Sequence, residues 1–371
     1  MMDFQYHLPT RIMFGVGVLD ELGPVVNEFH PKRVLVVTGR GAMRRTGVLD
    51  RVVELLGDRD VLVFEDVESD PSTDTVDRAA ALGDGADLIV GLGGGSSLDA
   101  AKAVSIMLGN GGKASELIRG KSIAKHGPRI IAIPTTSGTG SEVTEVSVLS
   151  ERAGRVKRSF RSVHMYPAVA LDDPELTRTM PKDVTCSSGL DALTHAVEAL
   201  TSKKSQPIPD VICLEAGRLV LENIGVAYED GGNMESRNSM MLGSLMAGFG
   251  ITHAGAGLAH GLSYSIWRVK GTAHGLACGI LLPHVMRFNL GHDGGKYVRL
   301  ARACGLKKPE DLIFRIEDVC RSMGVPERLG ELGFSSDDIE PMIGLGMGGS
   351  TKLNPRPVDE KTMRGFIESI I

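Results

Sequence analysis

Aromatic residues are scarce in this chain, at 4% of its 371 residues, and only one of them is tryptophan. Five cysteines occur, but no two of them form a CxxC pair. The odd number and the spacing favour free thiols in a reducing compartment over a disulfide framework. No stretch reaches the roughly 18 apolar residues that a membrane span needs, and the N-terminus lacks the basic start and apolar core of a signal peptide. We therefore expect a cytoplasmic protein that does not enter a membrane.

Charge is also nearly balanced, with a formal net charge of −5. Such a balance favours neither nucleic acid nor an anionic membrane as a partner. The basic run at residues 155–161 is short, and it indicates a local phosphate contact or a solvated face. Glycine is abundant instead, at 47 residues, which indicates many tight turns and close backbone approaches. The length and the 42% hydrophobic content suit a large core spread over roughly two to three domains.

The first half of the chain alternates strand and helix patterns. Short β-branched runs predict strands at residues 33–39, 61–67, 87–95 and 129–136, and periodic segments between them predict helices at 48–57, 75–85 and 97–108. This alternation is typical of a parallel sheet with helical crossovers. After about residue 180 the apolar spacing becomes helical throughout. We predict an α/β domain with a parallel Rossmann-like sheet over residues 1–178, then an all-α helical domain over 179–371, with the active site in the interdomain cleft.

Four residues form a candidate metal site: Asp191, His195, His260 and His274. Asp191 and His195 are four residues apart in a predicted helix, so both side chains leave the same face. One carboxylate and three imidazoles suit a divalent metal such as Fe²⁺ or Zn²⁺. Alternatively, the first two form a hydrogen-bonded helical pair and the others are core histidines. Unpaired polar groups in these apolar segments would be costly, and a bound metal removes that cost.

Two glycine-rich loops follow predicted strands. The backbone N–H groups of Gly94, Gly95 and Ser96, with the N-terminus of the next helix, can bind a pyrophosphate. The second loop, at residues 133–149, offers the hydroxyls of Thr135, Thr136 and Thr139. The alternative for the first loop alone is a tight turn without a ligand, and for the second a solvated polar loop. Two such loops at the ends of neighbouring strands favour a nucleotide crevice.

The chain resembles the iron-containing (group III) alcohol dehydrogenases in five segments, at residues 91–104, 133–144, 189–200, 258–275 and 280–289. That family is related in fold to dehydroquinate synthase and glycerol dehydrogenase. The resemblance covers essentially the whole chain. It implies that Asp191, His195, His260 and His274 hold the metal, that Gly93, Gly94, Gly95 and Ser96 bind pyrophosphate, and that Thr135, Thr136 and Thr139 contact the nucleotide. It also implies that Lys157 lies near the cofactor ribose and Asp99 near the nicotinamide. Tyr264 stands where many members carry a histidine; Tyr264 and His164 are candidate pocket residues.

The cofactor preference is predicted from the end of the first long strand. NAD-preferring members of that family often carry an aspartate there, whereas this chain has Gly39 followed by Arg40, with Arg44 and Arg45 close by. The missing carboxylate and the arginines favour NADP(H) over NAD(H), because a guanidinium fork suits a phosphate. Alternatively, these arginines form the solvated start of a helix.

The resemblance implies a metal-dependent alcohol dehydrogenase or aldehyde reductase, which moves a hydride between a small primary alcohol or aldehyde and the nicotinamide. The family suggests iron, although a nitrogen-rich site binds Zn²⁺ more tightly than Fe²⁺. A glycerol dehydrogenase-like or other polyol or hydroxy-acid dehydrogenase is the alternative. Dehydroquinate synthase would need more basic residues at the site, and a non-catalytic nucleotide- or metal-binding protein would not need both loops and all four ligands. Relatives are often dimers or larger, so we expect a homo-oligomer.

Overall fold

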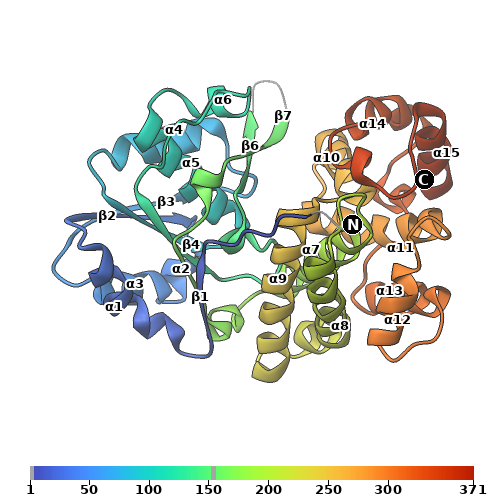
Figure 1. The fold of residues 1–371 in the computed structure, drawn as a ribbon, viewed down its shortest axis with the longest axis horizontal. Helices are drawn as coiled ribbons and strands as arrows, with labels where there is room; N and C mark the ends of the chain where they lie inside the picture. Colours follow the sequence, from blue (N-terminus) through green and yellow to red (C-terminus); the bar gives the residue numbers. More distant parts are fainter. Residues whose placement is uncertain (1–3, 152–155) are drawn as a thin grey trace. The chain divides into compact units, whose positions relative to one another are not determined.

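The computed structural model describes residues 4–151 and 156–371. These residues form two compact units. The first, called here the α/β unit, contains residues 7–136 and 140–179, and the second, the helical unit, contains residues 4–6, 137–139 and 180–371. The helical unit therefore includes two short segments that lie far before residue 180 in the sequence. Figure 1 colours the α/β unit from blue to green and most of the helical unit from green to red.

The α/β unit is built on a six-stranded sheet in the order β1-β8-β5-β4-β2-β3. Its strands are β1 (Arg11–Phe14), β2 (Arg33–Gly39), β3 (Asp60–Val67), β4 (Leu88–Gly93), β5 (Arg129–Pro134) and β8 (Val169–Asp172). Every pairing among them is parallel, which confirms the predicted sheet. β1 and β8 were not predicted, since four residues are too few to show a pattern.

Helices cover both faces of this sheet, as parallel sheets require. Alternate residues of the central strands point to opposite faces, so Val34, Val36 and Val90 pack with η1 (Val18–Glu21), α1 (Leu22–Phe29) and α3 (Val48–Leu56). Leu35, Val37 and Ile89 pack on the other side with α4 (Thr73–Leu82), α5 (Gly95–Asn110) and α6 (Ala114–Leu117). The short helix α2 (Ala42–Arg45) follows β2. The predicted helices at 48–57, 75–85 and 97–108 are α3, α4 and α5.

An antiparallel hairpin adds to the α/β unit. It pairs β6 (Val146–Glu151) with β7 (Val156–Arg161). β7 contains most of the basic run predicted as a phosphate contact or a solvated face, whose first residue, Arg155, lies outside the described residues. Its cations are partly paired, because Lys157 contacts Asp70 and Arg161 contacts Glu145. Short 3-10 turns complete this unit: η2 (Ser141–Val143), η4 (Val163–Met165) and η5 (Pro174–Thr177).

The helical unit confirms the predicted change to helices. It contains α7 (Lys182–Thr201), α8 (Pro207–Glu229), α9 (Met234–Ala254), α10 (Leu258–Lys270), α11 (His274–Asn289), α12 (Lys296–Ala303), α13 (Pro309–Ser322), α14 (Ile339–Gly346) and α15 (Glu360–Ile370), with turns η6 (Leu329–Leu332), η7 (Ser336–Asp338) and η8 (Thr351–Leu353). The centre is α7, which is buried at every position from Gly189 to Thr201. Among the described residues no helix is long and apolar enough to cross a membrane.

Candidate metal and cofactor site

Three helices of the helical unit bring the predicted metal ligands together. Asp191 and His195 lie one turn apart on α7, His260 is near the start of α10, and His274 is the first residue of α11. α11 approaches α7 closely because it has no side chain at two contact positions. A Cβ at Gly275 would collide with the Ser187 carbonyl, and one at Gly279 with the side chain of Leu190.

The ligand atoms converge on one carboxylate oxygen. Oδ1 of Asp191 lies 3.5 Å from Nε2 of His260 and 3.5 Å from Nε2 of His274. The His195 ring stacks on the His260 ring with centroids 4.4 Å apart. Asp191, His195 and His260 are buried, while the side chain of His274 is 24% exposed. The site is thus enclosed on α7 and α10 and open at the start of α11.

All three imidazoles present the same nitrogen to a protein acceptor. Nδ1 of His260 lies 2.7 Å from Glu198, Nδ1 of His274 lies 3.0 Å from the Ser263 hydroxyl, and Nδ1 of His195 lies 3.3 Å from the Gly138 carbonyl. Donation through Nδ1–H leaves the Nε2 lone pair of each ring available to a metal, the usual arrangement behind a histidine ligand.

Two buried atoms at the centre have no hydrogen-bond partner among the described residues: Oδ1 of Asp191 and Nε2 of His260. Such atoms cost free energy unless something satisfies them. A divalent cation would satisfy both, and the carboxylate and imidazole donors suit Fe²⁺ or Zn²⁺. The residues therefore fit a metal.

The electrostatics of Asp191 and His195 agree with the ligand role. Burial opposes ionisation of Asp191, but the neighbouring His195, His274 and His260 outweigh it and hold the pKa of the carboxyl well below its usual range. Burial lowers the pKa of His195, which favours the neutral imidazole that a metal requires. For His260, burial also acts to lower the pKa, but Cys278, Asp191 and Glu198 outweigh it and raise the pKa of the imidazole well above its usual range, so an entering metal must displace a proton there.

Two residues of the candidate site were not predicted from the sequence, Glu198 and Cys278. Glu198, on α7, accepts hydrogen bonds from the backbone N–H groups of Gly257 (2.8 Å) and Ala259 (2.6 Å) as well as facing His260. Cys278 lies one turn after His274 on α11 and its Sγ is 3.9 Å from Nε2 of His274. The only available signal was spacing: Glu198 is seven residues after Asp191, and Cys278 is four after His274.

The predicted pyrophosphate loop joins β4 to α5 in the α/β unit. Gly93 has φ 138°, in the region that favours glycine, and a Cβ there would lie 2.6 Å from Oγ of Ser97. Gly94 is the N-cap of α5, and Gly95 is its first residue. The Ser96 hydroxyl accepts from the Asp70 backbone at 3.2 Å. The loop thus places a 16-residue helix at the carboxyl edge of the sheet, and no side chain of the described residues caps its N-terminus with a hydrogen bond.

The second predicted loop starts beside the first. The Gly93 carbonyl accepts from the backbone N–H of Thr135 at 3.0 Å, and a Cβ on Gly94 would lie 3.1 Å from the Thr136 side chain. Thr135 and Thr136 belong to the α/β unit, whereas Thr139 belongs to the helical unit. The glycine loop and the first two threonines therefore meet at the ends of neighbouring strands, β4 and β5.

Comparison with known proteins agrees with this arrangement. Residues 9–174 match the model of the iron-containing alcohol dehydrogenase family, and residues 185–371 match that of its C-terminal part. The chain belongs to the iron-containing alcohol dehydrogenases. It is therefore an oxidoreductase of this family.

Several relatives show the range of this family. The chain is 31% identical to a 1,3-propanediol dehydrogenase of Klebsiella pneumoniae, covering 96% of each chain. It is 30% identical to an NADPH-dependent butanol dehydrogenase of Clostridium saccharobutylicum, covering 99% of this chain and 97% of that one. The solved sulfoacetaldehyde reductase of Bifidobacterium kashiwanohense, in complex with NAD+, superposes with a TM-score of 0.94 at 29% identity, covering 100% of this chain and 99% of that one.

The resemblance to these dehydrogenases predicted a place near the nicotinamide for Asp99. Both of its carboxylate oxygens have protein partners: Oδ1 accepts from the Ser141 hydroxyl at 2.6 Å, and Oδ2 from the Val148 N–H at 2.8 Å. The ammonium of Lys102, fully buried, lies 3.8 Å from Oδ1 and donates to Ser141 and Thr144. Asp99 therefore ties α5 to η2 and to strand β6 of the hairpin.

Lys157 was predicted near the cofactor ribose. Its ammonium lies 2.5 Å from Oδ1 of Asp70, and its side chain is 5% exposed. Asp70 has φ 55°, a left-handed conformation, and its backbone N–H donates to the hydroxyl of Ser96 in the predicted pyrophosphate loop. Lys157 and the glycine loop are therefore linked through one residue.

The arginines after β2 are already paired with carboxylates. Nε of Arg40 lies 2.6 Å from Oδ1 of Asp66, whose Oδ2 is 2.7 Å from Arg78. Arg44 contacts Glu65 at 2.7 Å. Gly39 closes β2 without a side chain. The end of β2 thus lacks a carboxylate of its own, but β3 brings Glu65 and Asp66 beside the arginines.

The two candidate pocket residues lie in different units. The Tyr264 ring stacks on His274 with centroids 5.6 Å apart, so it lies against the metal site. His164 belongs to the α/β unit and packs edge-on against His126 at 4.3 Å. Of the two, Tyr264 is the one placed beside a predicted ligand.

Proposed function

We propose that this chain interconverts a small primary alcohol and its aldehyde with a nicotinamide cofactor, at a metal held by Asp191, His195, His260 and His274. The observation that carries the proposal is the pair of buried atoms without partners, Oδ1 of Asp191 and Nε2 of His260, at the point where the ligand side chains converge. When bound, the metal supplies a Lewis acid for the alcohol oxygen, and the nicotinamide supplies the hydride acceptor.

The protein's own residues position these groups. Glu198 accepts from Nδ1 of His260, which fixes the orientation of that ring and aims Nε2 toward Asp191. Ser263 does the same for His274. Gly93 and Gly94 keep the N-terminus of α5 open to the cofactor pyrophosphate. Tyr264, stacked on His274, forms an aromatic wall for the substrate.

NADP(H) is the proposed preferred cofactor. The end of β2 carries Gly39 rather than a carboxylate that would repel a 2′-phosphate, and Arg40 follows it. Arg40 is engaged by Asp66 in this structure, so a phosphate must compete with that carboxylate. We therefore expect a modest preference, with NAD(H) also accepted. The metal is proposed to be Fe²⁺ or Zn²⁺.

A panel of substrates and cofactors tests the proposal. Purified protein loaded with Fe²⁺ or Zn²⁺ is assayed with short aldehydes, primary alcohols, 1,3-propanediol and glycerol, each with NADPH and NADH. We expect the highest kcat/KM for a small aldehyde with NADPH. Highest kcat/KM for glycerol or 1,3-propanediol would favour the polyol dehydrogenase alternative. A protein that binds metal and nucleotide but turns over none of these compounds would exclude a dehydrogenase.

A homodimer or larger homo-oligomer located in the cytoplasm is also proposed. The five cysteines are free, as a reducing compartment would keep them. Sedimentation velocity of the metal-loaded protein tests the oligomer, with a monomeric species of 39.5 kDa as the contrary result.

A further inference from the structure

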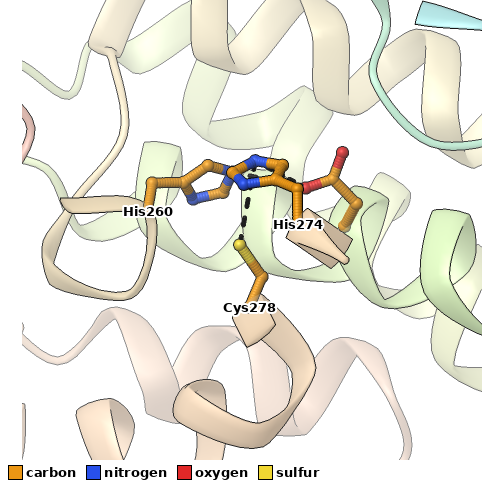
Figure 2. A group of neighbouring side chains, drawn as sticks. His260, His274 and Cys278 are labelled. Carbon is orange, nitrogen blue, oxygen red and sulfur yellow. Dashed lines mark hydrogen bonds and ion pairs between the residues drawn. The ribbon is translucent and has the colours of Figure 1, made fainter. Parts of the chain in front are cut away.

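One thiol lies among the metal-site side chains. Cys278 is fully buried on α11, one helical turn after His274, so both side chains leave the same face of the helix. Its Sγ is 3.9 Å from Nε2 of His274. Figure 2 shows the sulfur pointing from α11 toward the imidazoles of His260 and His274.

The thiol belongs to a compact group of donor atoms. Asp191, His260, His274 and Cys278 each offer one ligand atom, and these four atoms all lie within 4.8 Å of one another. Two of them, Oδ1 of Asp191 and Nε2 of His260, are buried without a hydrogen-bond partner. The sulfur therefore faces polar atoms that need a further partner.

The spacing of the group suits coordination. Metal–nitrogen bonds of about 2.0 Å and metal–sulfur bonds of about 2.3 Å place neighbouring ligand atoms roughly 3.0 to 3.6 Å apart around an ion with four or five ligands. The distances here are 3.5 Å for both contacts of Asp191 and 3.9 Å between sulfur and nitrogen. The sulfur is therefore within reach of an ion bound by Asp191 and His274, with all four donor atoms within 4.8 Å of one another.

We propose that the Cys278 thiolate is a ligand of the metal in this site, in addition to the carboxylate and imidazole donors. The proposal rests on the metal site of the proposed function. A sulfur donor makes the site softer, which favours Zn²⁺ over Fe²⁺ beyond the preference of nitrogen donors alone. The metal binds the thiolate, so the thiol proton leaves to solvent when the ion enters.

The absorption spectrum of the cobalt-substituted protein tests directly for a metal–sulfur bond. The full-length protein is stripped of metal with a chelator and loaded with Co²⁺, and its absorption spectrum is recorded. We expect a near-ultraviolet thiolate-to-cobalt charge-transfer band, which Cys278→Ser removes while the visible cobalt bands remain. Cys213→Ser is the matched control, because Cys213 is equally buried in the helical unit but lies on α8 outside the group, and it should keep the band.

Metal competition gives a second measurement. We expect Cys278→Ser to lower the affinity for Zn²⁺ at least tenfold, to lower that for Fe²⁺ less, and thus to reduce the zinc-to-iron ratio bound from an anaerobic mixture. A native cobalt spectrum with visible bands but no charge-transfer band overturns the proposal, as does failure to take up cobalt or an unchanged zinc affinity in the variant.

The outcome is separable from that of the proposed function. Turnover of alcohol or aldehyde without a charge-transfer band refutes the sulfur ligand alone. A charge-transfer band in a protein that turns over no alcohol or aldehyde leaves the ligand in place and refutes the dehydrogenase.

Discussion

Glu198 and His260 form a buried carboxylate–imidazole pair, with Oε2 of Glu198 2.7 Å from Nδ1 of His260. The pair orients the ring so that Nε2 faces Asp191 at 3.5 Å. Because a carboxylate behind a ligand histidine fixes its tautomer and raises its basicity, we expect Glu198→Gln to lower metal affinity about 10- to 100-fold. Competition with a chromophoric chelator measures the change.

Glu229→Gln is the matched control for this prediction. Glu229 ends α8 and forms an exposed ion pair with Lys182, so its loss should leave metal affinity unchanged. Glu198 also accepts two backbone N–H groups at the start of α10, and circular dichroism must therefore show that Glu198→Gln is folded. A folded Glu198→Gln protein with wild-type metal affinity would refute the role assigned to this pair.

The histidines of α10 and α11 should be indispensable for the metal. Replacing His260 or His274 with alanine removes one imidazole donor and leaves Oδ1 of Asp191 with one nitrogen at 3.5 Å instead of two. We expect less than one tenth of an equivalent of bound metal by elemental analysis and loss of turnover to about background. His284→Ala is the control, because His284 lies later on α11 and contacts the Glu327 carbonyl. Full turnover in a metal-free His274→Ala protein would refute a metal-dependent reaction.

The sheet was predictable where strands are long and buried. β2, β4 and β5 are runs of Val, Ile and Leu that end in glycine or proline, and their length and composition suffice. β1 and β8 have four residues each and take their extended form from pairing with each other and with β5. Their place in the sheet depends on contacts that local sequence does not encode.

In the candidate site, too, local spacing was predictable from the sequence and contacts between distant segments were not. The spacing of Asp191 and His195 is helical and visible in the sequence, and so is that of His274 and Cys278. A lone cysteine in the apolar segment ACGILL is typical of a protein core, however. Only the packing of α11 beside α10 places its sulfur within 4.8 Å of the ligand atom of His260. Likewise, the partners of Arg40 depend on β3 lying beside β2, which brings Asp66 to the arginine.

Asp66 should limit the affinity for NADPH. It neutralises Arg40 at 2.6 Å and Arg78 at 2.7 Å, at the end of the strand next to Gly39. Asp66→Asn removes the nearer negative charge beside Arg40 and leaves Glu68 at 3.9 Å, so the guanidiniums of Arg40 and Arg78 become more available to a 2′-phosphate. Because exposed ion pairs contribute up to about 1 kcal/mol, we expect a two- to fivefold tighter Kd for NADPH. Quenching of intrinsic fluorescence measures it, and the Kd for NADH should change little.

Glu65→Gln tests whether the position of the charge matters. Glu65 also forms an ion pair with an arginine, since its carboxylate lies 2.7 Å from Arg44. Among the ion pairs of the described residues, however, it does not contact Arg40, which pairs with Asp66. We expect Glu65→Gln to change the NADPH affinity less than Asp66→Asn does. Equal tightening of NADH and NADPH in Asp66→Asn would count against a 2′-phosphate site at Arg40.

Glu142 should make stability depend on pH. It is buried in η2, and burial raises the pKa of its carboxyl to about 7, against the opposing effects of a backbone hydrogen bond and Lys102. Between pH 4.5 and about 7, Glu142 keeps its proton in the folded state but loses it in the unfolded state. The stabilisation of the folded state that comes from this proton is therefore complete below pH 4.5 and is lost as the pH rises through about 7. Glu142→Gln keeps a neutral group at all pH values. We therefore expect the urea midpoint of the wild type to fall from pH 5 to pH 8 more than that of Glu142→Gln. Glu116→Gln is the control, because Glu116 is an exposed carboxylate on α6 paired with Lys121, and its urea midpoint should change with pH as that of the wild type does. Identical pH profiles for the wild type and Glu142→Gln would refute the role of Glu142 in this pH dependence.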